Sequence, residues 1–273
     1  MSLVVPPCRC TILSVRRLSF LLCLVLGCGG GDEPAAIDAA ATIDAELVTD
    51  APDELDAALD ADSSVPLPGF GAISGMCGVL TPTELDGTTP LWFGGTLDFG
   101  TDRYDDPAER PLLTPGGRHI VETPNAGGSS LYSEVFAFEW MARCELATLL
   151  KTETEIVYDV DGKKADLLVE IDGRKVGVSV VRFVKYPFGT AYPIEDALPL
   201  VTRKIEDLRL ATGQASAADR WTSQMVVALA YDTQHAQVAM QAWNMLDAST
   251  RGSTIFIVVV SEGTGDMFIY TDS

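Results

Sequence analysis

The chain has 273 residues, a formal net charge of −20 and a sequence pI near 4.3. Affinity for nucleic acid depends mainly on cationic side chains that neutralise phosphates, so this excess of acid disfavours nucleic acid as a partner. The six cysteines and two histidines include no Cys-x-x-Cys pair, which argues against a zinc site.

The first 27 residues have the features of an export signal. Three arginines and no acidic residue precede a short apolar run, Leu18 to Leu26, which is too short to span a bilayer as an ordinary helix. The run ends at Gly27-Cys28 and is followed by three glycines. An ordinary cleaved signal and a buried apolar segment of a cytosolic protein are the alternatives.

The Gly27-Cys28 junction resembles the lipobox of bacterial lipoproteins. The resemblance implies that residues 1–27 are a signal peptide and that Cys28 carries a diacylglyceryl group and an amide-linked fatty acid such as palmitate. Several acyl chains anchor a protein stably, so the membrane itself would be a partner through Cys28. The expected location is the cell envelope, on the outer membrane, facing the periplasm or the cell surface.

Residues 28–68 are predicted to be the lipidated cysteine followed by an acidic linker. From residue 29 to 68 the chain has eleven acidic residues, no Lys or Arg, and no aromatic side chain. Such a segment buries too little apolar surface to offset the entropy of ordering, and its like charges repel, so we expect an extended, solvated spacer. A transient helix near residues 53–61 and a partner-binding acidic tail are the alternatives.

Residues 69–130 are rich in Gly and Pro but contain apolar islands at Leu91–Phe93 and Ile120-Val121. We therefore expect an irregular segment with short strands, packed on the following domain. Cys77 lies in this segment. It and Cys144 are the two cysteines left after the signal peptide and Cys28 are set aside; they can pair in an oxidising compartment or remain buried thiols.

Residues 131–273 are predicted to form an α/β domain. Apolar residues at helical spacing predict a helix from about Tyr132 to Lys151. A period of two then predicts a three-stranded antiparallel meander with turns at Asp161-Gly162 and Asp172-Gly173, because Asp-Gly favours two-residue hairpins. These turns would place Asp159 opposite Lys164, and Glu170 opposite Lys175, as favourable cross-strand charge pairs.

The rest of the domain alternates helices and strands. Helices are predicted over residues 194–212 and 233–246, and strands over 225–231, 254–260 and 267–270. Strands 225–231 and 254–260 are almost continuously apolar, as in strands buried on both faces. The predicted order is αβββαβαββ, a mixed α+β sheet flanked by helices.

This order resembles the restriction-endonuclease-like superfamily, the PD-(D/E)xK fold. The stretch from Glu134 to Tyr270 is also similar to a group of uncharacterised proteins that carry this domain. Active members of the superfamily hold an acid on the second strand and an acid-x-lysine on the third, often with a glutamate from the first helix. The resemblance implies that such acids bind Mg²⁺ and that the lysine positions or activates water for phosphodiester hydrolysis.

The predicted register assigns these positions in the chain. Asp166 matches the second-strand acid and falls opposite Ser179, which takes the place of the third-strand acid, while Val181 takes the place of the lysine. Glu139 or, as the second choice, Glu134 would supply the helix carboxylate. Two of the three signature residues are therefore replaced.

Three interpretations follow. The first is a degenerate nuclease fold that acts as a binding or structural module for an unidentified protein or small molecule, without a cofactor. The second is a metal-dependent hydrolase whose lysine has migrated to Lys204 or Lys185, with Glu139 and Asp166 holding Mg²⁺. The third is an unrelated fold in which Asp166 is an ordinary strand residue.

Overall fold

The computed structural model describes residues 65–102, 106–124, 130–263 and 266–271, all of which belong to one unit of the chain. The predicted signal peptide, Cys28 and nearly all of the acidic linker lie outside the described residues. None of the described helices combines the length and hydrophobicity that a membrane-spanning segment requires.

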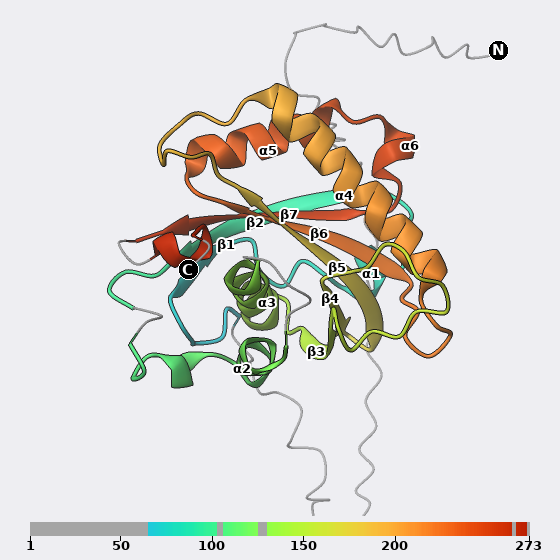
Figure 1. The fold of residues 1–273 in the computed structure, drawn as a ribbon, viewed down its shortest axis with the longest axis horizontal. Helices are drawn as coiled ribbons and strands as arrows, with labels where there is room; N and C mark the ends of the chain where they lie inside the picture. The colour runs from blue at the N-terminus through green and yellow to red at the C-terminus, as the bar shows by residue number, and fades with distance from the viewer. Residues whose placement is uncertain (1–64, 103–105, 125–129, 264–265, 272–273) are drawn as a thin grey trace, which may run out of the picture. The chain divides into compact units, whose positions relative to one another are not determined.

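Seven strands form one mixed sheet in the order β1-β2-β7-β6-β5-β4-β3 (Figure 1). The strands are β1 (Ala72–Gly75), β2 (Leu91–Asp98), β3 (Thr148–Thr152), β4 (Leu167–Ile171), β5 (Arg174–Phe183), β6 (Ser223–Ala230) and β7 (Ile255–Glu262). β2, β7, β6 and β5 run parallel, whereas β1 pairs antiparallel with β2, and β4 lies antiparallel to both β5 and β3. The four parallel strands therefore form the centre of the sheet.

Helices cover both faces of this sheet. The α-helices are α1 (Pro82–Leu85), α2 (Pro115–Glu122), α3 (Leu131–Cys144), α4 (Ile194–Gln214), α5 (Thr233–Met245) and α6 (Ala248–Arg251), and the 3₁₀ helices are η1 (Arg110–Leu112) and η2 (Asp266–Ile269). Helices α2 and α3 lie on one face, and α4 and α5 on the other (Figure 1). Along β5, for example, Val178 and Val180 pack toward α3, whereas Val181 and Phe183 pack toward α4. This alternation gives each face its own apolar core.

The predicted fold class, a mixed sheet flanked by helices, is confirmed, and the order of elements agrees from α3 to β7 except for the short helix α6, which was not predicted. The helix predicted to run to Lys151 is wrong at its end. It stops at Cys144, and Leu146 adopts a left-handed backbone conformation with φ of 56°. That turn redirects the chain, and Lys151 lies in β3.

The second predicted hairpin is confirmed. β4 and β5 pair with Glu170 opposite Lys175. The φ angles of Asp172 and Gly173 are 47° and 72°, as a type I′ turn requires. The register that placed Asp166 beside Ser179 follows from this turn.

The first predicted hairpin, at Asp161-Gly162, is wrong. The strand that pairs with β4 is β3, and residues 153–166 form a long connection between the two. In this connection Ile156 is buried in the core on the α4 side, and Tyr158 forms an isolated bridge with Ala215 at the end of α4. The spacing of two between Ile156 and Tyr158 therefore comes from a loop that these side chains anchor to the core, and not from a strand.

Two strands of the sheet, β1 and β2, come from the segment 69–130, where short strands were expected. Leu91–Phe93 opens β2, which pairs in parallel with β7, whereas Ile120-Val121 lies in α2. The strand predicted at residues 267–270 is also wrong, because Asp266–Ile269 is the 3₁₀ helix η2.

Candidate functional site

Asp166 lies directly before β4. Its backbone and its side chain both form hydrogen bonds with the neighbouring strand β5. Its N–H donates to the carbonyl of Val178 at 2.9 Å, and its Oδ2 accepts from the N–H of Val180 at 2.5 Å. The hydroxyl of Ser179 donates to the same oxygen at 2.9 Å. The predicted neighbours Asp166 and Ser179 are therefore in direct contact.

Lys204, on α4, reaches the same carboxylate. Its Nζ lies 3.5 Å from Asp166 Oδ2, and the two side chains are 27% and 21% exposed. The lysine predicted to have migrated thus lies at Asp166. Lys185, the other candidate, instead forms an ion pair with Asp196 at 2.5 Å.

The carboxylate that α3 brings toward Asp166 belongs to Glu134. This residue is 5% exposed and accepts a hydrogen bond from the Ser130 hydroxyl at 2.7 Å. Burial, and secondarily repulsion by Asp166, raises the pKa of Glu134 to about 7, while the bond from Ser130 and the charge of Lys204 act in the opposite direction. Burial thus favours the protonated form of Glu134.

Glu139, the first choice for this position, lies elsewhere. Its Oε1 accepts from the N–H and hydroxyl of Thr114, at 2.8 and 2.7 Å, where Thr114 caps α2. Burial raises the pKa of Glu139, and no contribution from Asp166 accompanies it. Five residues along a helix correspond to a rotation of about 140°, so Glu134 and Glu139 face different neighbours.

Glu153 also belongs to the surroundings of Asp166 and was missed. Burial and repulsion by Asp166 raise its pKa, while the charges of Lys164 and Lys204 lower it. Nothing in the sequence marked Glu153, because the predicted helix ran almost to this residue. We call Glu134, Glu153, Asp166, Ser179 and Lys204 the Asp166 corner.

The Asp166 corner does not fit a magnesium ion. Ser179 and Val181 are 4% and 5% exposed, and neither supplies a charged ligand or a proton-transfer group. Over the described ranges, no three His, Cys, Asp or Glu side chains are grouped closely enough to hold a metal ion. Since Asp166 Oδ2 already receives two hydrogen bonds and faces Lys204, we derive no reaction step through a metal.

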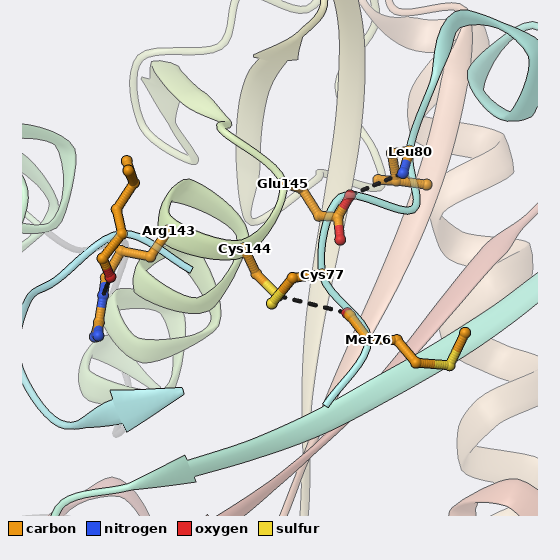
Figure 2. Close-up of a disulfide and its surroundings, with 7 residues drawn as sticks. Met76, Cys77, Leu80, Arg143, Cys144 and Glu145 are labelled. Carbon is orange, nitrogen blue, oxygen red and sulfur yellow. Dashed lines mark hydrogen bonds between the residues drawn. A yellow bond between two sulfur atoms is a disulfide. The ribbon is translucent and has the colours of Figure 1, made fainter. Parts of the chain in front are cut away.

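The carboxyl-terminal end of α3 fastens the segment that precedes β2. Cys144 is joined to Cys77 by a disulfide (Figure 2). Arg143 donates to the carbonyls of Leu67, Phe70 and Gly71 at 2.9, 2.6 and 2.7 Å. Glu145 accepts from the N–H of Leu80 at 2.8 Å. We call Arg143, Cys144 and Glu145 the α3 clamp.

Comparison with known proteins adds little about activity. No protein-family model matches the chain. Over 182 residues the chain is 31% identical to the AAC-rich mRNA clone AAC4 protein of Dictyostelium discoideum, an alignment that covers 63% of this chain and 26% of that protein. The chain thus spans about a quarter of the length of this relative.

Among solved structures, the chain is similar to Pyrococcus furiosus SfsA in complex with Ca²⁺. The sequences are 12% identical, and the match covers 74% of this chain and 94% of that one, with a TM-score of 0.26. A TM-score this low does not establish a common fold.

Proposed function

We propose that the chain is a lipid-anchored protein of the bacterial cell envelope whose folded domain is a binding or structural module. The domain is a degenerate form of a nuclease-like fold and needs no cofactor. The lipobox-like junction at Cys28 supports the anchor. The disulfide between Cys77 and Cys144 supports export, because such bonds persist in oxidising compartments and are rare in the cytosol.

The observation that carries the non-catalytic assignment is the engagement of Asp166. Its Oδ2 accepts from Ser179 and Val180, both on β5. A carboxylate used this way joins the start of β4 to the middle of β5, a structural task. The positions of the superfamily's second acid and lysine are filled by buried Ser179 and Val181.

A divalent-metal-dependent phosphodiester hydrolase is the second candidate. It is favoured by Lys204, whose ammonium lies 3.5 Å from Asp166, and by Glu134, which is electrostatically coupled to Asp166. Asp166, Lys204 and Glu134 correspond in chemical type to the strand acid, the lysine and the helix glutamate of active superfamily members. Metal binding through Oδ2 of Asp166 would require this oxygen to exchange its hydrogen bonds from Ser179 and Val180 for the ion.

One experiment separates the two candidates. The purified full-length chain is titrated with Mg²⁺ and Mn²⁺ by calorimetry and incubated with single- and double-stranded DNA and RNA. We expect neither binding nor cleavage. Metal-dependent cleavage that Asp166→Ala abolishes, and that the surface control Asp86→Ala preserves, would establish the hydrolase instead.

The anchor is tested separately. Cys28→Ser should release the protein from membranes of the expressing bacterium and stop incorporation of labelled palmitate. Cys23→Ser, which changes a cysteine within the predicted signal peptide, should leave both unchanged. Continued labelling of the Cys28→Ser protein would contradict the proposed lipidation site.

A further inference from the structure

A polar cavity of about 410 Å³ opens at the amino-terminal ends of β6 and β7. Its walls come from the end of α4, from the residues that lead into β6, and from α6 with the residues that lead into β7. No residue of the Asp166 corner lines it. The volume lies in the range of small-molecule binding sites.

The lining is suited to hydrogen bonding and contains no Asp or Glu. Apart from Trp221 and two glycines, its members carry hydroxyl, amide or guanidinium groups, and they are Arg209, Thr212, Thr222, Gln224, Ser249 and Ser253. Asp247 is the carboxylate that contacts this lining, through the hydroxyl of Ser249. It is otherwise occupied in capping α6, where it accepts from the N–H of Thr250. The hydroxyls of Thr212 and Ser249 already donate to the carbonyl of Leu208 and to Asp247, so a ligand in the cavity meets the hydroxyls of Thr222 and Ser253 and one fixed positive charge.

Arg209 is held in position by α6. One of its terminal nitrogens donates to the carbonyl of Thr250 at 2.8 Å and to that of Ser249 at 3.5 Å. Gly252 provides the space, because a Cβ there would come within 3.3 Å of the same nitrogen. The other guanidinium nitrogens make no hydrogen bond or ion pair with any described residue and remain available to a ligand.

Three further cations adjoin lining residues. Arg220 directly precedes Trp221, Arg251 directly precedes Gly252, and the carbonyl of Lys175 accepts from the N–H of Thr222. Lys175 and Arg220 donate to backbone carbonyls of Ala218 and Ala215, and Arg251 lies over the ring of Trp243. Among the described residues, Arg209, Arg220 and Arg251 form no ion pair with a carboxylate, whereas Lys175 lies opposite Glu170 and its charge acts on Asp219.

This arrangement is unusual for such an acidic domain. Residues 69–273 contain 28 acidic and 16 basic side chains, so most cations have acidic neighbours within reach. Arg209, Arg220 and Arg251, which form no ion pair with a described carboxylate, create a local positive potential that attracts anions.

We propose that this cavity binds a small phosphomonoester, with its phosphate on Arg209. A phosphate offers three terminal oxygens and close to two negative charges near neutral pH, which suits a guanidinium assisted by hydroxyl donors. Thr222 and Ser253 are the hydroxyls placed to assist. The cavity is larger than a phosphate alone, and Gln224 and Thr212 present hydrogen-bonding groups to a hydroxylated organic part.

Equilibrium dialysis of the full-length chain tests the ligand class. The probes are ribose 5-phosphate, inorganic phosphate and ribose. We expect saturable binding of both phosphates, tighter for ribose 5-phosphate, and none for ribose. Absence of saturable binding to either phosphate, or equal binding of ribose, would overturn the proposal.

Variants test the location. Arg209→Met should lower the affinity for ribose 5-phosphate by about tenfold or more, since hydrogen bonds to charged groups are the strong ones. The matched control is Arg203→Met on the same helix, outside the cavity lining, which should bind like the unaltered chain. Equal affinities of the two variants would contradict the assignment of Arg209.

A second variant tests the same cavity in case Arg209→Met does not fold. A Cβ at Gly213 meets no atom within 4 Å, so Gly213→Leu should fold normally and fill part of the cavity. It should reduce binding at least as much as Arg209→Met. Asp166→Asn should bind ribose 5-phosphate normally, which separates this cavity from the Asp166 corner. Undiminished binding by Gly213→Leu would place the phosphate elsewhere.

Discussion

Helix α3 carries buried charged side chains at both ends, and the two ends use them differently. Near the start, Glu134 faces the partly exposed Asp166 corner, and its pKa rises to about 7. At the other end, Arg143 is 2% exposed, and its guanidinium donates hydrogen bonds to three backbone carbonyls. Burial of charge alone therefore does not mark a functional group; what the charge faces decides its role.

The largest effect should come from the disulfide of the α3 clamp. Cys77 and Cys144 are 67 residues apart, so the bond restricts a long loop of the unfolded chain. The double variant Cys77→Ala/Cys144→Ala should lose about 4 kcal/mol of unfolding free energy in urea titrations. Reduction of the unaltered chain with a thiol should reproduce this loss. An unchanged midpoint would show that the bond does not contribute to stability.

Arg143→Met should be next. The substitution keeps an aliphatic stem but leaves the carbonyls of Leu67, Phe70 and Gly71 without their buried donor, which should cost about 3 to 4 kcal/mol. Hydrogen exchange should show the faster opening at residues 67–80 first. Arg203→Met, at an exposed site, is the control. Similar losses of unfolding free energy in both variants would show that the hydrogen bonds of Arg143 do not stabilise the domain.

Glu134→Gln should act in the opposite direction, with a gain in stability that begins above about pH 4.5 and is complete above about pH 7. The pKa of Glu134 rises from 4.5 to about 7 on folding, so the folded chain binds more protons in this window and its stability falls as the pH rises through it. Glutamine imitates the protonated form, so the variant should be more stable at about pH 8 by up to roughly 3 kcal/mol. The gain should disappear below about pH 4. A variant that is less stable at both pH values would contradict this pKa.

The smallest expected effect is a change in pKa that distinguishes the two glutamates of α3, Glu134 and Glu139. Asp166→Asn removes a charge that raises the pKa of Glu134 but contributes nothing to that of Glu139. Carboxyl-carbon NMR titrations should show a lower pKa for Glu134, still above 4.5 because burial is the larger cause, and no change for Glu139. Equal shifts would mean that both residues sense Asp166.

The hairpin of β4 and β5 could be predicted from the sequence because its determinants are local. Asp172-Gly173 fixes the turn, and Glu170 and Lys175 confirm the register. This register alone brought Asp166 and Ser179 together correctly. The same dipeptide at Asp161-Gly162 gave a wrong hairpin prediction. The residues that flank it are fixed by contacts with the end of α4, far along the chain.

Other features depend on distant contacts. β2 pairs with β7, more than 150 residues later, and a Gly-rich segment gives no local sign of such a partner. The end of α3 depends on Leu146, a residue that rarely adopts a positive φ. The choice between Glu134 and Glu139 required the rotation of α3 relative to the sheet, which the apolar pattern of a helix buried on nearly all sides did not reveal.

The α3 clamp also determines how the domain would resist mechanical load. A pull on the chain ahead of Val65 would first strain the hydrogen bonds of Arg143 to residues 67–71. If these gave way, at most the residues before Cys77 could be drawn out, because the force would then pass through a covalent bond into α3. The sheet behind it, from β2 onward, would be shielded from unravelling from this end.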